Sequence, residues 1–265
     1  MRKLTLLFAL LSCLSFISHA QRINVSPAIV RFSAGPADAQ SQKIALINNG
    51  ENPQILQIAN GDWFRDEHGE HNYLPVDSIP QSCSNWLSVS HDLIEVPAES
   101  TVEITLTISP PSSYKQDSMK WAMLFIKGVV EKADPLNPKD KLSTTIKENF
   151  QFGIHVYNTP ASLTSAKAEA SNMELNPEKN AFLLEINNTG KTQIKGSAQL
   201  AFVHLATGDE FDSKELEAPI FPGYSRIFKL EIPKDLPKGE YSVMGLFDYG
   251  EDYPIEGFET SYTIE

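Results

Sequence analysis

The stretch ALINNGENPQ (45–54) has a close counterpart in LEINNTGKTQ (184–193). In each, an apolar run ends at Ile-Asn-Asn, and a glycine and polar residues follow, which aligns Asn48 with Asn187. Asn and Gly tolerate the left-handed backbone that tight turns require, so each phrase indicates a strand that ends in a turn. Because the two phrases lie in different halves of the chain, we expect one architecture to occur twice.

The surroundings of the two phrases repeat as well. VPAEST (96–101) leads into the alternating run VEITLTI, and FPGYSR (221–226) leads into IFKLEI. This order of landmarks is typical of sandwiches of about seven strands in the immunoglobulin-like arrangement. We therefore predict an all-β chain with two immunoglobulin-like β-sandwich domains in tandem.

Most of the chain has the pattern of short strands separated by Gly, Pro, Asn and Ser, and no stretch sustains a helical period. We place the first domain at 21–159 and the second at 160–265. The run FQFGIHVY (150–157) has alternating apolar residues on one face and is expected to close the first sandwich. The predicted strands of the first domain are Lys43–Ile47, Gln54–Ile58, Val102–Ile108, Trp121–Lys127 and Gln151–Tyr157.

Residues 1–20 have the composition of a secretory signal peptide. Arg2 and Lys3 precede an apolar run from Leu4 to Ile17, and Ser18-His19-Ala20 provides a small-x-small cleavage site before Gln21. The run is shorter than the roughly 20 residues of a spanning helix, so we expect cleavage, secretion and no membrane span in the mature chain.

The mature chain is strongly acidic. Without residues 1–20 it has 20 basic and 34 acidic side chains, a net charge of −14. This balance argues against nucleic acid or an anionic membrane surface as the main partner. Only Cys83 remains after cleavage, so no internal disulfide can form, and we expect a buried thiol.

Four segments of the first half resemble the amino-terminal domain of the periplasmic pilus-assembly chaperones of the chaperone-usher type. The resemblance covers residues 23–160, and the second half is similar only in being another sandwich. The segments are INVSPAIVRF (23–32), LINNGENP (46–53), VPAESTVEITLTI (96–108) and FQFGIHVYNTP (150–160), together with the acidic and aromatic pair Asp117 and Trp121 ahead of an apolar strand.

The resemblance implies a periplasmic protein whose client is a pilus or surface-fibre subunit. Such a chaperone lends the last strand of its first domain to the incomplete sandwich of the client, by pairing at a strand edge. The side chains that would be offered to the client are Ile146, Phe150, Phe152 and Ile154.

The family also binds the terminal carboxylate of its client with an Arg in the first strand and a Lys near the end of the last strand. Here Ile29 and His155 align with these positions, and Arg31 lies two residues away on the same strand face. An aliphatic chain and a neutral imidazole cannot hold a carboxylate as a charged pair does. We therefore take Arg31 and His155 as candidate cleft residues.

A second resemblance leads to a different binding function. The Gly69–Tyr73 loop, the aromatic Trp86 and the Val-Pro step at 96–97 are similar to paired sandwich domains of Gram-positive surface proteins that bind peptidoglycan or surface proteins. In this alternative, Trp63 and Trp86 are open loop aromatics that bind a ligand by stacking.

Neither relative is an enzyme, and the sequence has no catalytic motif. There is no Gly-x-Ser-x-Gly elbow and no phosphate-binding glycine loop. His68 and His71 lie among acidic residues in DWFRDEHGEHNY (62–73), which we interpret as a solvated hairpin loop and not as a metal site. We expect no metal and no cofactor.

Overall fold

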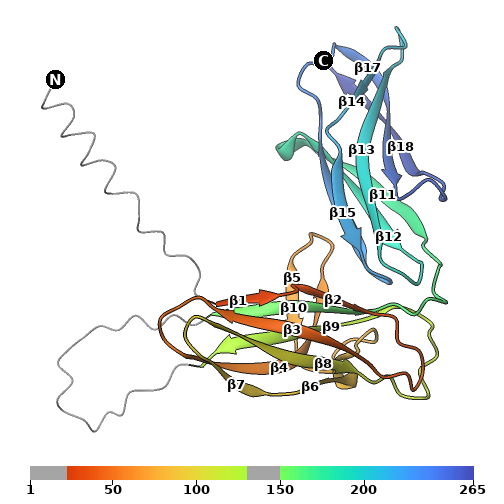
Figure 1. The fold of residues 1–265 in the computed structure, drawn as a ribbon. Coiled ribbons are helices and arrows are strands. Elements are labelled where there is room, and N and C mark those ends of the chain that lie inside the picture. The colour runs from red at the N-terminus through yellow and green to blue at the C-terminus, as the bar shows by residue number, and fades with distance from the viewer. Residues whose placement is uncertain (1–22, 130–149) are drawn as a thin grey trace, which may run out of the picture.

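A computed structural model describes residues 23–129 and 150–265 as two β-sandwiches arranged in an L (Figure 1). Strand β10 (Gln151–Asn158) ends the first sandwich, and β11 (Ala168–Asn176) begins the second. The prediction of an all-β chain with two immunoglobulin-like sandwiches is confirmed. The signal peptide expected at 1–20 and the candidate Ile146 lie outside the described residues.

The first domain packs two sheets against each other, and all five predicted strands are present. One sheet has the order β1-β3-β8-β6, and the other has the order β2-β10-β9-β4-β5, with β7 paired to β4. The strands are β1 (Ile23–Ser26), β2 (Ile29–Phe32), β3 (Gln40–Asn48), β4 (Gln54–Arg65), β5 (His71–Leu74), β6 (Leu87–Val89), β7 (Leu93–Val96), β8 (Ser100–Ile108) and β9 (Lys120–Gly128), and a short 3-10 helix spans Ser84–Trp86.

Alternation of apolar and polar residues builds the core of the first domain. On β3, Ile44 and Leu46 are fully buried while their neighbours are exposed or half-buried. On β8, Ile104 and Leu106 face them from the adjacent strand. Burial of each such side chain stabilises the fold by about 1.5–3 kcal/mol, and the alternation fixes which face of each sheet turns inward.

The second domain is a smaller sandwich. A sheet in the order β11-β12-β16 packs on a sheet in the order β14-β13-β17-β18, with β15 paired to β13. The remaining strands are β12 (Ala181–Asn188), β13 (Ile194–His204), β14 (Glu210–Asp212), β15 (Leu216–Ile220), β16 (Ser225–Glu231), β17 (Gly239–Asp248) and β18 (Glu256–Ile264), and a 3-10 turn spans Pro177–Lys179.

The repeated Asn phrase ends equivalent strands, with an offset of one residue from the sequence alignment. Asn48 ends β3 and Asn188 ends β12, and both are 1% exposed. Each Oδ1 accepts a hydrogen bond at 2.9 Å from the glycine N–H two residues on, at Gly50 and Gly190. The alignment of Asn48 with Asn187 is therefore wrong, because the Asn-x-Gly spacing, and not the Asn-Asn pair, sets the turn.

The two domains meet through a third apolar cluster. Trp63, Trp121 and Tyr157 of the first domain pack with Phe221 of the second. The N–H of Met119 donates to the Lys191 carbonyl across the junction at 2.8 Å. This contact explains why β9 is buried on both faces near its start, where alternation gives way to a continuous apolar run. In the part of the chain described, no helix is both long and apolar enough to cross a membrane.

Candidate protein-binding site

Half of strand β10 has a free edge. Along its whole length β10 pairs with β9, but on its other side β2 pairs only with residues 155–158. This happens because β1 pairs with β3 in the opposite sheet and the chain crosses to β10 only at β2. Among the described residues, 151–154 therefore have no strand beside them on this edge.

The backbone groups on the free edge belong to alternate residues. The N–H of His155 donates to Ala28 on the β2 side at 3.1 Å, and the carbonyl of Phe150 accepts from Gly128 on the β9 side at 3.2 Å. Because strand backbones alternate in direction, the N–H and C=O groups of Gln151 and Gly153 point toward the free edge. These groups can accept a further strand, as exposed sheet edges do.

The predicted client-facing side chains divide into two groups. Phe150 and Phe152 are half-buried at the open end of the sandwich, with ring centroids 5.4 Å apart. Ile154 is 1% exposed and belongs to the core of the first domain. The expectation that Ile154 offers its side chain to a client is therefore wrong for this structure, because β10 needs that residue for its own packing.

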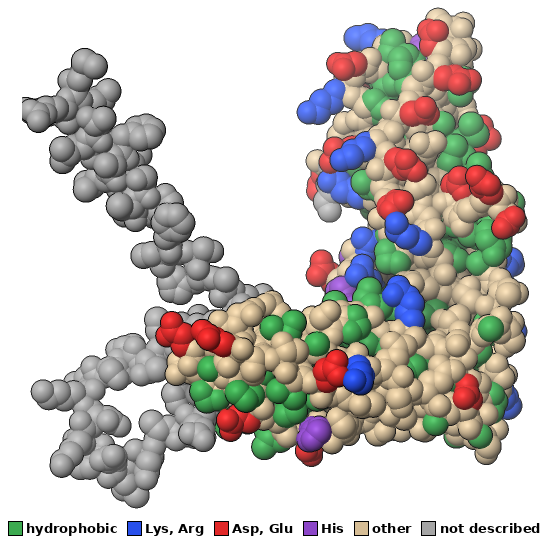
Figure 2. Space-filling model, viewed as in Figure 1, with side chains coloured by type: hydrophobic (Ala, Val, Ile, Leu, Met, Phe, Trp, Pro, Cys, Tyr) green, Lys and Arg blue, Asp and Glu red, His purple; other side chains and the backbone are tan. Residues whose placement is uncertain are grey.

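The opposite face of the β2–β10 pair turns toward the second domain and carries the two candidate cleft residues, Arg31 on β2 and His155 on β10. In the parallel register, His155 lies opposite Ile29, and Tyr157 lies opposite Arg31. The Arg31 Cζ lies 5.5 Å from the centroid of the Tyr157 ring, and the His155 ring stacks with Tyr157 at 6.0 Å. The structure thus brings Arg31 and His155 together around Tyr157. Figure 2 shows Lys, Arg and His side chains gathered at the inner corner between the two domains.

His155 is a neutral residue at ordinary pH. Burial lowers its pKa to about 4, with smaller contributions from His71 and Arg65. Its ring contacts Trp63 edge-on at 4.5 Å. Burial also raises the pKa of Tyr157, so its hydroxyl stays neutral as well. The positive charge beside Tyr157 therefore comes from Arg31. His155 therefore contributes shape and not a permanent positive charge.

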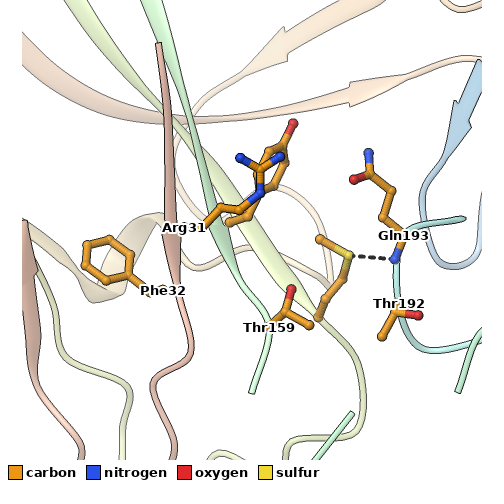
Figure 3. A pocket seen from close by; sticks show the side chains of 7 residues that line it. Arg31, Phe32, Thr159, Thr192 and Gln193 are labelled. Carbon is orange, nitrogen blue, oxygen red and sulfur yellow. Dashed lines mark hydrogen bonds between the residues drawn. The ribbon is translucent and has the colours of Figure 1, made fainter. Parts of the chain in front are cut away.

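A pocket of about 300 Å³ opens beside Arg31 at the domain junction (Figure 3). Arg31, Phe32, Tyr157 and Thr159 line it from the first domain and the hinge. From the second domain, Gln193 donates its N–H to the Met119 sulfur at 3.0 Å and closes one side. The pocket combines an arginine, hydroxyl groups and an aromatic ring, which suits a ligand with both polar and apolar groups. The remaining lining residues are Met119 and Thr192.

The proposed stacking aromatics are not open. Trp63 is 1% exposed on β4, and its Nε1 donates to the Ala122 carbonyl at 3.2 Å, so the prediction that it is an exposed loop aromatic is wrong. Trp86 is half-buried, with its ring 4.8 Å from that of Tyr114. The expected core position of Trp121 is confirmed. The sequence alone did not indicate that the second domain buries Trp63.

The structure also shows where Cys83 and the two histidines of the segment 62–73 lie. Cys83 is 1% exposed, and burial raises its thiol pKa, which agrees with the expected inert thiol. His68 lies in the turn of the β4–β5 hairpin, while His71 stacks on Trp63 at 5.2 Å. In the described part of the chain, no group of three or more His, Cys, Asp or Glu side chains is placed to hold a metal ion.

Comparison with solved structures finds the same two-domain architecture in chains of two chaperone complexes. A chain of a chaperone–tip adhesin complex for CFA/I fimbriae biogenesis matches with a TM-score of 0.52 and 15% identity, over 91% of this chain and 98% of that one. This chain shares its two-domain fold. A chain of the chaperone–tip subunit pre-assembly complex from the archaic chaperone-usher Csu pili of Acinetobacter baumannii matches with a TM-score of 0.50 and 12% identity, over 90% and 98%.

At these identities the comparison establishes the fold and nothing finer. No family model matches the sequence. No curated protein matches it either.

Proposed function

We propose that this protein is a periplasmic chaperone for surface-fibre subunits and acts without catalysis. It binds a client by adding a strand of the client to the free edge of β10. The observation that carries the proposal is that, among the described residues, no strand pairs with 151–154 on this edge, because β2 covers only residues 155–158. An edge of this kind favours strand addition, which supplies affinity through main-chain hydrogen bonds.

The fold likeness supports the same function. The matched chains come from chaperone complexes with a tip adhesin and with a tip subunit. Phe150 and Phe152 lie next to the free edge and are half-buried, so they can contact apolar side chains of an incoming strand. Arg31 lines the pocket on the opposite face, where it can contact an end of the client, and His155 stacks on Tyr157, which also lines that pocket.

A substitution at Gln151 tests the edge directly. Gln151 is exposed, and its N–H points toward the free edge, so Gln151→Pro removes one edge donor and places a ring where a strand would approach. No hydrogen bond to β9 is lost. The matched control Gln151→Ala changes the side chain and keeps the donor.

The readout is co-purification of clients with the tagged mature chain from the envelope of its own host, identified by mass spectrometry. We expect a small β-rich subunit with the native chain and with Gln151→Ala. With Gln151→Pro we expect at least about tenfold less of this subunit to co-purify, which corresponds to a loss of about 1.4 kcal/mol in the free energy of binding. Equal recovery with Gln151→Pro, or recovery of cell-wall fragments without any subunit, would contradict the proposal.

A further inference from the structure

The turn of the β4–β5 hairpin docks on the second domain. The N–H of Ile227 on β16 donates to the Glu67 carbonyl at 2.7 Å. Gly69 in the turn has φ of 89°, and a Cβ at this position would overlap the guanidinium of Arg226. The positive φ of the turn therefore favours glycine, and a side chain at this position would force the Arg226 guanidinium to move.

Positive groups crowd this contact. Burial lowers the pKa of Arg226, and Arg65 lowers it further, while Asp66 and Glu70 act in the opposite sense. The Nε atoms of Arg65 and Arg226 are buried and have no hydrogen-bond partner among the described residues. The Asp66 carboxylate accepts hydrogen bonds from the turn, and the one from Glu70 lowers its pKa most, so Asp66 stays ionised in mild acid.

Two imidazoles lie close together at the base of this hairpin, His71 on β5 and His155 on β10. His71 lies opposite Arg65 in the β4–β5 register, and its ring is 5.7 Å from that of His155. Trp63 lies against both rings. His71 Nε2 and His155 Nδ1 are buried without a hydrogen-bond partner in the described part of the chain. A doubly protonated ring would therefore carry a buried N–H with no acceptor, whichever nitrogen holds the first proton.

We propose that the β4–β5 hairpin is an acid-sensitive latch between the two domains, held closed while His71 and His155 are neutral and released when they are protonated. The titratable and charged groups that face His71 are Arg65, Glu70, Tyr73 and His155. Those that face His155 are His71, Arg65 and Tyr157. Only Glu70 favours the protonated form. The latch includes His155 of β10, but that residue pairs with β2, so the latch does not use the free edge at 151–154.

The direction of the pH effect follows from linkage. In the latched state burial lowers the pKa of His155 to about 4, and burial is also the main cause that lowers the pKa of His71. In the released state both return toward about 6.5. Release therefore takes up protons, so it becomes more favourable as the pH falls below about 6.5 and gains nothing further below the latched pKa.

Energy transfer between dyes on the two domains measures release. Leu93→Cys in the first domain and Leu205→Cys in the second provide attachment sites, because these residues are 57% and 59% exposed, while Cys83 is buried. We expect a reversible change in transfer between pH 7.5 and pH 4.5 without loss of the far-ultraviolet dichroism of the sandwiches. The protection of the Ile227 amide against hydrogen exchange should fall about tenfold over the same range.

Variants assign the change to the latch. The combined His71→Phe and His155→Phe variant keeps rings on Trp63 and should hold the neutral-pH transfer value throughout, whereas His91→Phe, at an exposed position, should respond as the native chain does. Gly69→Val should give the acid value at both pH values, because its side chain displaces Arg226. Energy transfer in the native chain that does not change between pH 7.5 and 4.5 would overturn the proposal. So would a change in transfer with pH that persists in the double Phe variant.

Discussion

Substitution of Asn48 by Ala should destabilise the first domain by about 3 kcal/mol. Its Nδ2 lies 2.8 Å from the Asn52 carbonyl, 3.1 Å from that of Val96 and 3.0 Å from that of Pro97, and its Oδ1 accepts from Gly50. Alanine leaves these buried groups without a partner. At about 1 kcal/mol for each group that loses its hydrogen bond, and with water replacing part of the loss at the turn, the sum is about 3 kcal/mol.

The equivalent substitution in the second domain is Asn188→Ala, and its expected cost is similar. The Asn188 Nδ2 donates to Thr192 at 2.9 Å and to Ile220 at 2.8 Å, and Oδ1 accepts from Gly190. The matched controls are Asn49→Ala, at an exposed position, and Asn187→Ala, at a half-buried one. Each control should cost less than about 0.5 kcal/mol, which is the usual range for surface changes.

Urea unfolding followed by two probes separates the domains. All three tryptophans lie in the first domain, so fluorescence reports that domain, while far-ultraviolet dichroism reports both. With a slope of about 1.5 kcal/mol/M, 3 kcal/mol lowers the fluorescence midpoint of Asn48→Ala by about 2 M. A large effect of Asn187→Ala with a small effect of Asn188→Ala would refute the structural pairing of the two turns.

Three further predictions concern single buried groups. Asp62→Ala should lower stability by about 2–3 kcal/mol, because the buried carboxylate accepts hydrogen bonds from Ser78 N–H and the Ser82 hydroxyl; an unchanged fluorescence midpoint would contradict this. Cys83 should resist iodoacetamide at pH 8 in the native protein and react readily in urea, since burial raises its pKa; rapid native labelling would show that the thiol is accessible. Tyr241→Phe should cost about 1 kcal/mol, seen as a lower dichroism midpoint, because the hydroxyl donates to the Pro237 carbonyl at 2.6 Å; no shift would mean that this bond adds nothing.

The fold could be predicted from local signals because strand periodicity and turn chemistry act over short distances. Alternation on β3 and β8 and the Asn-x-Gly turns sufficed to place strands and to find the duplication. The one-residue error at Asn187 arose because two adjacent asparagines are equivalent in sequence, and only the buried one serves the turn.

The site was harder to predict because it depends on which surfaces other elements cover. Trp63 follows the strand predicted at Gln54–Ile58 and precedes a charged loop, so it has the sequence pattern of an open aromatic. In the structure it lies on β4, and Phe221 from the second domain packs on it with ring centroids 5.1 Å apart. Ile154 belongs to an alternating apolar run, and nothing local distinguishes residues that fill the domain's own core from those left at its open end. The free edge at 151–154 depends on β2 pairing only with residues 155–158, which is a long-range feature of the register.

The most direct test of the central claim is hydrogen exchange at the Gln151 and Gly153 amides in the mature chain, alone and with a co-purified client. Both N–H groups point toward the free edge, so they should exchange readily alone and become at least about tenfold slower when a client strand pairs with them. The Phe152 amide points toward β9 and serves as the internal reference. Unchanged exchange at Gln151 and Gly153 in a stable complex would contradict client binding at the β10 edge.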